Sequence, residues 1–281
     1  MSGEGSQRRI SLCADDYGIS PGVNRAIRDL IERGRINATS AMVVGPAIAR
    51  EEVDALKTAV AGNPRCAIGL HATLTAPFHP LTMHYRPLEG GLFLPLAKML
   101  RLSLLRRLEP DMILDEVKAQ IAAFVERFGR TPDYVDGHQH VQIFPQVRDA
   151  FLSAVKSTAP HAWVRQCGRR QPPAKRPGSP KALLLDILSA GFRRRAERAG
   201  VRFNPGFAGA YDFTRAAGFD DLMQGFLNDT PDGGLIMCHP GFVDDTLIAL
   251  DPLTGQRERE YAFLSGDGFG AMLAANKVTL D

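Results

Sequence analysis

The chain contains 281 residues, of which 44% are hydrophobic and 23% are charged, and this composition is typical of a folded protein, not of a disordered or fibrous one. A net charge of +3 and an aromatic content of 7% exclude the strongly basic, base-stacking surfaces of nucleic-acid-binding proteins, so we expect no nucleic-acid partner. No apolar run is long enough to cross a bilayer.

The N-terminal residues and the cysteines indicate a cellular compartment. Residues 1–9 lack the apolar core of a signal peptide, and we expect them to form a disordered lead-in to a single domain over residues 10–281. The cysteines are too widely separated for a zinc-finger or redox motif, and they are Cys13, Cys66, Cys167 and Cys238. Unpaired thiols favour a reducing environment, so we expect a cytoplasmic protein.

The first predicted strand, residues 10–14, ends in two adjacent carboxylates, Asp15 and Asp16. A turn follows, and then an amphipathic helix over residues 21–34, with Ser20 as its cap and Pro21 at its first position. Two acids this close raise the pKa of one of them unless a cation or donor relieves the repulsion. The structural alternative is that one acid caps the turn and the other faces solvent.

Strand-like and helical segments then alternate as far as a third strand, near the end of which lies His71. The segments are a strand over 38–45, a helix over 48–60 and a strand over 66–74. Residues 76–109 break this pattern with an extended loop and helix insertion, in which 94–107 is leucine-rich and basic. We interpret that helix as a lid or a dimer-packing element, which leaves a homodimer open, and a lipid-facing helix is the alternative.

The second half of the chain continues the alternation. After a helix over 111–128, a strand over 134–141 would place Asp136, His138 and His140 on one face, because strand side chains at i, i+2 and i+4 point the same way. The remaining expected segments are a helix to about 156, a strand at 162–167, a basic loop at 169–181, a helix at 182–199, a glycine-rich stretch at 203–213, a helix at 220–227, a strand at 235–241, helices at 258–264 and 269–275, and a strand near Val278.

The repeated strand–helix alternation predicts an α/β fold with about seven mainly parallel strands, since parallel strands need crossover connections. We expect a single TIM-barrel-like (β/α) barrel, and an open doubly wound sheet is the alternative. Both architectures place ligands at the carboxyl ends of the strands. The fold class therefore predicts that the site lies at that edge.

Polar side chains gather at four of these predicted strand ends. They are Asp15, Asp16, His71, Asp136, His138, His140 and His239. Any one of these histidines is most simply a hydrogen-bonded core residue, but several converging with two aspartates need a shared partner. A divalent metal satisfies them together, and an Asp with two His is a normal three-ligand set that leaves positions open for water and substrate.

Six motifs occur in order over nearly the whole chain. They are Ala-Asp-Asp-Tyr-Gly-Ile-Ser-Pro-Gly-Val-Asn (14–24), Thr-Ser-Ala-Met-Val (39–43), Ile-Gly-Leu-His-Ala-Thr-Leu-Thr (68–75), Tyr-Val-Asp-Gly-His-Gln-His-Val (134–141), Met-Cys-His-Pro-Gly-Phe (237–242) and Arg-Glu-Arg-Glu-Tyr-Ala-Phe-Leu (257–264). Together they resemble the YdjC-like carbohydrate deacetylases, also called the ChbG/HpnK group. The resemblance implies a barrel-like α/β fold, a divalent metal and hydrolysis of an N-acetyl group from an amino sugar.

The resemblance also implies roles for particular residues. Carried onto this sequence, Asp16, His71 and His138 match metal ligands, Asp15 matches the base and His239 matches the acid. Many members have a third alternating histidine where this chain has Gln142, so the choice between His138 and His140 as ligand stays open. We place His140, Asp136 and Asp244 around the substrate or behind the ligands, with Asp244 or Asp245 orienting the ring of His239.

The expected enzyme is a metal-dependent hydrolase that acts on an N-acetylglucosamine-containing oligosaccharide or glycolipid. Its ion would be zinc or magnesium, with manganese, cobalt and nickel as alternatives. A different metallohydrolase, acting on a phosphoester or another amide, is a second hypothesis, although no phosphate-cradling glycine loop occurs. A non-catalytic sugar- or lipid-binding barrel is the third. The basic segments 94–107 and 169–181 would contact an anionic or lipid-linked sugar, or else form a subunit interface and a solvated face.

Overall fold

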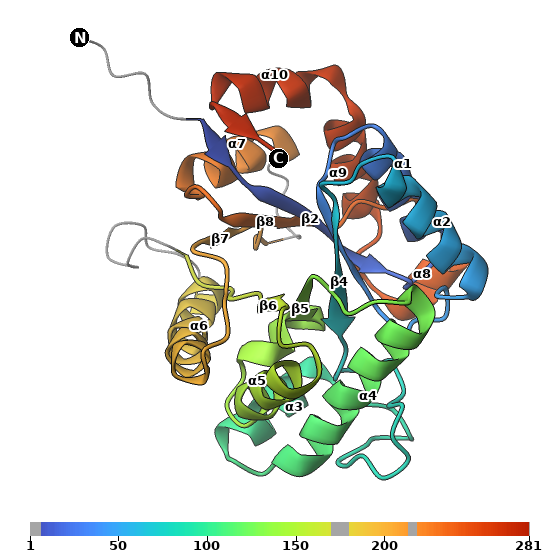
Figure 1. Cartoon of the computed structure of the whole chain (residues 1–281), viewed down its shortest axis with the longest axis vertical. Coiled ribbons are helices and arrows are strands. Elements are labelled where there is room, and N and C mark those ends of the chain that lie inside the picture. Colours follow the sequence, from blue (N-terminus) through green and yellow to red (C-terminus); the bar gives the residue numbers. More distant parts are fainter. Residues whose placement is uncertain (1–6, 170–179, 213–217, 281) are drawn as a thin grey trace.

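A parallel β-sheet surrounded by helices forms the centre of the computed structural model, which describes residues 7–169, 180–212 and 218–280 (Figure 1). The strands are β1 Arg8–Arg9, β2 Ser11–Tyr17, β3 Ala38–Ala41, β4 Ala67–Ala72, β5 Tyr134–Gly137, β6 Trp163–Val164, β7 Phe207–Ala208, β8 Leu235–Cys238 and β9 Val278–Thr279. The helices are α1 Pro21–Glu32, α2 Arg50–Ala61, α3 Leu96–Leu104, α4 Pro110–Phe128, α5 Val147–Thr158, α6 Pro180–Ala199, α7 Phe219–Asp229, α8 Asp245–Leu250, α9 Gly255–Ser265 and α10 Asp267–Ala275, with a 3-10 segment η1 at His138–Ile143.

Seven strands pair in the order β6-β5-β4-β3-β2-β8-β7, and every pairing is parallel. The sheet curls so far that Val164 of β6 makes an isolated parallel bridge to Phe203, just before the other edge strand. This curled, barrel-like arrangement confirms the predicted fold class. Because all seven strands run the same way, their carboxyl ends share one edge of the barrel.

Sequence signals explain several of these elements. The Ser20 hydroxyl accepts a hydrogen bond from the Val23 N–H (3.2 Å) at the start of α1, as the cap prediction requires. In the insertion, the buried Glu116 of α4 accepts hydrogen bonds from the backbone N–H groups of Leu81 (3.0 Å) and Thr82 (2.9 Å). The insertion after β4 is therefore held against α4.

Two predicted segments differ in the structure. The strand predicted over residues 134–141 is β5, and it ends at Gly137. The 3-10 segment η1 begins at His138 and contains two left-handed residues, Gln139 (φ 54°) and His140 (φ 60°). The predicted i, i+2, i+4 arrangement of Asp136, His138 and His140 is therefore wrong. Arg8 and Arg9, expected in a disordered lead-in, form β1 paired with β9, while residues 1–6 lie outside the described residues.

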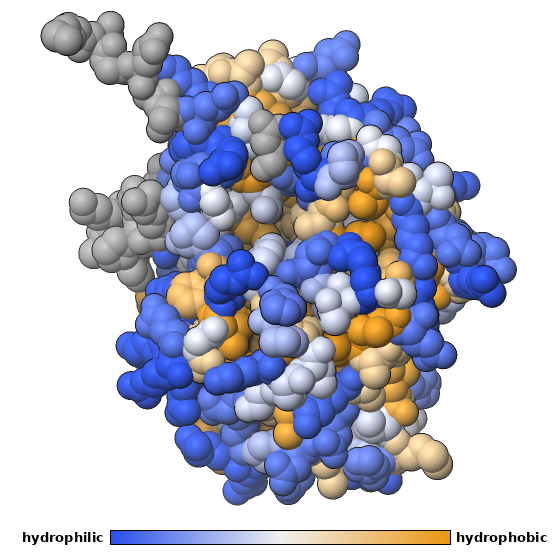
Figure 2. Space-filling view, viewed as in Figure 1, coloured by the Kyte–Doolittle hydropathy of each residue, from blue (hydrophilic) through white to orange (hydrophobic). Residues whose placement is uncertain are grey.

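The visible surface is mostly hydrophilic, with smaller hydrophobic patches between the polar residues (Figure 2). Among the described residues, several exposed large hydrophobic side chains lie at the C-terminal end of α3 and in the N-terminal half of α6, and others lie in the insertion, in α4 and in α8. They are Leu81, Met83, Leu104, Leu105, Val125, Leu183, Leu184, Ile187 and Ile248. None of the described helices combines the length and apolarity that crossing a membrane requires. Most of the predicted basic loop, residues 170–179, lies outside the described residues.

Candidate active site

A register shift near the end of β2 lets two adjacent carboxylates reach the neighbouring strands on the same side of β2. In a regular strand Asp15 and Asp16 would point to opposite faces of the sheet. Here the pairing of β2 with β3 shifts register between Ala14 and Tyr17, and Asp16 adopts a left-handed backbone (φ 70°). Both carboxylates are buried, and both contact groups around the same pair of neighbouring strands, β3 and β4.

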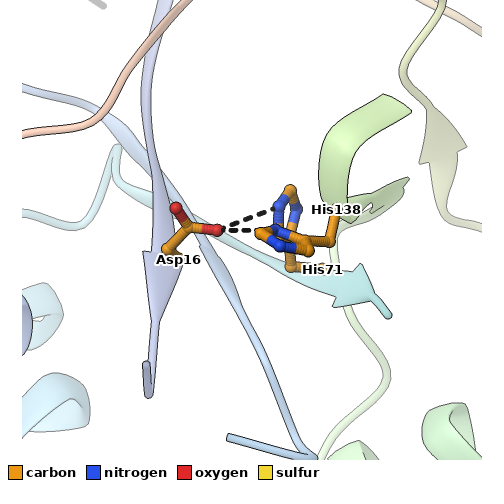
Figure 3. Close-up of side chains that lie close together, drawn as sticks. All are labelled: Asp16, His71 and His138. Atoms are coloured by element: carbon orange, nitrogen blue, oxygen red, sulfur yellow. Dashed lines mark hydrogen bonds and ion pairs between the residues drawn. The ribbon is translucent and has the colours of Figure 1, made fainter. Parts of the chain in front are cut away.

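Asp16 lies against two imidazoles that come from separate elements (Figure 3). Its Oδ1 atom is 3.3 Å from Nε2 of His71, on β4, and 3.0 Å from Nδ1 of His138, the first residue of η1. All three side chains are buried. The structure thus brings together the three residues that the sequence predicts as metal ligands, and it brings His138, not His140, to this cluster.

The far nitrogen of His71 is fixed by a second carboxylate. His71 Nδ1 lies 2.6 Å from Oδ1 of Asp136 and 3.1 Å from the Ser40 hydroxyl. The register of β4 and β5 pairs His71 directly with Asp136. A carboxylate behind a ligating histidine sets its ring orientation and its tautomer. Burial alone would lower the pKa of His71, but Asp136 and Asp15 raise it to about 10, so the cluster strongly favours a positive charge.

The Asp16–His71–His138 cluster fits a divalent cation. One ligand atom from each side chain lies within 4.8 Å of the other two. Two atoms bonded to one ion at about 2.1 Å, with angles between octahedral and tetrahedral, lie roughly 3.0–3.4 Å apart, which matches both distances from Asp16 Oδ1. The donor set of one carboxylate and two imidazoles, backed by Asp136, suits such an ion.

Asp15 is paired with a buried arginine that the sequence prediction missed. Arg165, just after β6, donates from Nη1 to Oδ2 and from Nη2 to Oδ1 of Asp15, both at 2.6 Å, and its Nη2 also contacts Asp136 at 2.6 Å. Burial opposes ionisation of Asp15, but Arg165 and His71 outweigh it and hold the pKa of Asp15 below its usual range. Asp15 is therefore an ionised carboxylate with a fixed orientation.

Asp16 has a buried arginine of its own. Nη2 of Arg257, on α9, lies 2.6 Å from Oδ2 of Asp16. Burial would raise the pKa of Asp16, but the charges of Arg257 and His138 lower it well below its usual range. Each of the adjacent acids thus has its own cation, and this relieves the repulsion expected between them.

The Arg165 pair leads to a stability prediction. We expect Arg165→Met to lower the free energy of unfolding by about 3–5 kcal/mol, because the variant leaves Asp15 and Asp136 buried without their cation. Urea denaturation measures this loss. The control is Arg130→Met, which removes a half-exposed pair with Asp133 and should cost less than about 1 kcal/mol. Equal losses for the two variants would contradict the structural importance of Arg165.

The imidazole of His239 belongs to the same region, just after β8. The register pairs Ala14 of β2 with Cys238, the last residue of β8. Asp15 and His239 each follow directly after this pair of residues. After Arg165 and His71, the nearby His239 also contributes to the low pKa of Asp15. The backbone N–H of His239 donates to the buried Glu260 of α9 at 2.6 Å.

Two predicted supporting residues, Asp244 and His140, have contacts outside the three-residue cluster. Asp244 caps α8, where its Oδ1 accepts from the Leu247 N–H (2.8 Å) and its Oδ2 accepts from the Gly22 N–H (2.6 Å). Both of its oxygens thus accept from backbone groups, and the role of Asp244 or Asp245 in orienting the ring of His239 stays a prediction. Nδ1 of His140 lies 3.5 Å from Sγ of Cys167, and the ring is close enough to Asp15, His239 and His71 for their charges to influence its pKa. Its place around the substrate or behind the ligands stays a prediction.

Comparison with known proteins identifies the family. The sequence model described as YdjC-like protein matches residues 9–275. The chain belongs to the YdjC-like family. A chitooligosaccharide deacetylase from Escherichia fergusonii is 29% identical over 250 residues, which cover 86% of this chain and 84% of that relative. The predicted family resemblance is thus confirmed.

Two solved structures share the fold of this YdjC-like protein. One, from Enterococcus faecalis, is a protein with a proposed role in cellobiose-phosphate cleavage; it has a TM-score of 0.76 at 20% identity and covers 98% of this chain and 97% of that one. The other is a lactam utilization protein from Thermus thermophilus, with a TM-score of 0.50 at 17% identity, covering 97% of this chain and 98% of that one. At these identities the likeness supports the fold alone.

Three buried charged residues of this YdjC-like protein were not predicted as part of the site. Arg165 is the one charged residue in an otherwise uncharged, strand-like segment, and that pattern could have marked it as a buried partner for an acid. Arg257 and Glu260 belong to the run Arg-Glu-Arg-Glu, which is typical of a solvated helix face. Only their spacing of three residues indicates that they share a face of α9.

Proposed function

We propose that the chain is a metal-dependent hydrolase that removes the acetyl group from an N-acetylglucosamine-containing oligosaccharide or glycolipid. The observation that carries the proposal is the three-residue cluster of Asp16, His71 and His138 with a separate ionised carboxylate, Asp15, beside it. Membership of the YdjC-like family and the relative named chitooligosaccharide deacetylase support the choice of substrate.

Asp15 and His239 would carry the proton transfers. When bound by Asp16, His71 and His138, a divalent ion supplies polarisation of the acetamide carbonyl and lowers the pKa of a water molecule. Asp15 would accept a proton from the attacking water as the water oxygen adds to the carbonyl carbon. Arg165 keeps the Asp15 carboxylate ionised and oriented during this step.

His239 would act on the departing nitrogen. An amide nitrogen leaves poorly unless it is protonated, so the C–N bond breaks as His239 transfers a proton to it. The products are acetate and the free amino sugar. Asp136 supports the reaction indirectly, because it holds the ring of His71 in the orientation needed for ligation.

The ligand set also bears on the metal and the compartment. Two imidazoles and one carboxylate suit zinc, and manganese, cobalt, nickel or magnesium are the alternatives that elemental analysis would distinguish. All four cysteines are buried and unpaired, which is compatible with the cytoplasmic location expected from the sequence. A homodimer stays a prediction.

The direct test of the proposed function is product release. We expect the purified protein, supplied with a divalent metal, to release acetate from acetylated chito-oligosaccharides and to release no phosphate from sugar phosphates. A parallel assay on glycolipids that carry N-acetylglucosamine would show whether the substrate is lipid-linked. Phosphate release without acetate release would contradict the proposal and favour a phosphoesterase on the same scaffold.

A further inference from the structure

We propose that helix α9 fixes the catalytic geometry through two positioning residues, Arg257 for the metal ligand Asp16 and Glu260 for the acid His239. This inference rests on the proposed function for those two roles. Helix α9 is far from Asp16 in sequence. The side chains of Arg257 and Glu260 are fully buried and lie about one turn apart on the same face of this helix. In the proposed mechanism, neither Arg257 nor Glu260 binds the metal or transfers a proton.

Arg257 restrains Asp16 from one side. Its Nη2 lies 2.6 Å from Oδ2 of Asp16, the oxygen that does not face the two imidazoles. Nη2 also lies 2.6 Å from Asp251, and Nε donates to the Leu253 carbonyl at 3.0 Å, so the guanidinium is itself held in place. Because Oδ2 is occupied, the geometry points to Asp16 as a ligand through Oδ1 alone.

Glu260 restrains the segment that carries His239. Its Oε2 accepts the backbone N–H of His239 at 2.6 Å, and its Oε1 accepts the hydroxyl of Tyr211 at 2.5 Å. The backbone carbonyl of Arg257 accepts the N–H of Gly241, two residues after His239, at 3.1 Å. A Cβ on Gly241 would lie 2.9 Å from Cγ2 of Val23 and 3.3 Å from Cδ of Arg257, so a side chain at this position would crowd both α1 and α9.

The helix has the support that such a function needs. It packs against α1, α7 and α10, so movement of α9 relative to the sheet is resisted by three other helices. Arg257 and Glu260 therefore hold Asp16, near the end of β2, and His239, just after the neighbouring strand β8, at a fixed separation. The two restraints act on different groups, and their loss should have different consequences.

The Arg257 restraint is tested by metal affinity, measured by competition with a chromophoric chelator and without any turnover. We expect Arg257→Met to weaken binding of zinc at least about tenfold, as loss of a partner behind a metal ligand does. Arg257→Lys keeps the charge with a single donor group and should weaken binding less, and it carries the test if the Met variant does not fold. Arg259→Met, on the exposed side of the same helix, is the matched control and should bind zinc like the wild type.

The Glu260 restraint is tested by kinetics on acetylated chito-oligosaccharides. We expect Glu260→Ala to lower kcat about tenfold with KM and zinc affinity unchanged, because only proton transfer to the leaving nitrogen is misaligned. Glu260→Gln keeps an acceptor for the His239 N–H and should recover most of kcat. A residue that merely stabilises the fold would alter zinc affinity and KM as well.

The two readouts separate this inference from the proposed function. If the wild type binds no zinc and releases no acetate, the proposed function itself fails. If the wild type does both, zinc binding by Arg257→Met as tight as that of the wild type would overturn the role of Arg257. Weaker zinc binding by Glu260→Ala, or an equal loss of kcat in Glu260→Gln and Glu260→Ala, would overturn the role of Glu260.

Discussion

Replacing Asp15 with asparagine should reduce acetate release by about 10²–10⁴-fold while the protein still binds one divalent ion. The amide side chain of Asn cannot accept the proton of the attacking water, although its shape still fits beside Arg165. Asp15 makes no contact with the imidazole nitrogens that face Asp16, so the three ligands are left in place. The measurement is kcat on acetylated chito-oligosaccharides with elemental analysis of the same preparation.

The control for this variant is Asp133→Asn, which changes a partly exposed carboxylate outside the cluster. It should leave both kcat and metal content near wild-type values. Turnover by Asp15→Asn at the wild-type rate would remove Asp15 as the base. Loss of the metal from that variant would show instead that Asp15 is part of the ligand set.

Replacing His71 with alanine should remove both the metal and the activity. This variant takes away one of three protein ligands, together with the nitrogen that Asp136 orients. Metal content should fall from about one ion per chain to near zero.

In the wild type a chelator should abolish acetate release, and added divalent ion should restore it. Because a metal must displace the proton that His71 holds below its raised pKa of about 10, affinity should fall as pH decreases.

A histidine two residues from a proposed ligand gives the matched comparison. His138→Ala should lose the metal like His71→Ala, whereas His140→Ala should keep it, because His140 lies beside Cys167 and Phe207. Burial and the charge of Arg165 lower the pKa of His140 to about 3, so its ring is neutral at physiological pH. Metal loss from His140→Ala, with retention in His138→Ala, would reverse the assignment of the ligand.

Much of the site follows from the sheet topology, which the sequence pattern predicts. Asp16, His71 and His138 come from distant parts of the chain, but each follows or ends a strand of one parallel sheet. The carboxyl ends of such strands meet at one edge, so their convergence needs no knowledge of side-chain contacts. The family motifs indicate the same residues independently.

The backbone details could not be predicted from periodicity. The left-handed conformation of Asp16, at the register shift between β2 and β3, occurs at a residue other than glycine, and no sequence pattern predicts it. The same holds for Gln139 and His140, where the expected strand becomes η1. Strand β5 ends at Gly137, directly before His138. His138 therefore reaches Asp16 from the first residue of η1 and not through strand alternation.

The buried arginines were missed because single-sequence reasoning assigns charged side chains to the surface. Arg165 and Arg257 are fully buried, and each neutralises one of two adjacent acids. The expected repulsion between the adjacent carboxylates of Asp15 and Asp16 indicated that cations lie nearby, since two buried carboxylates need positive partners. The sequence could state that requirement but could not say which of its 34 basic residues meet it.

The proposed function requires one divalent ion bound to Oδ1 of Asp16, Nε2 of His71 and Nδ1 of His138. Crystals grown with zinc, with diffraction data collected on both sides of the zinc absorption edge, test it directly. We expect one strong anomalous peak within bonding distance of those three atoms, with Oδ2 of Asp16 still bound to Arg257. A peak elsewhere, or none at this cluster with zinc bound at other sites, would contradict it.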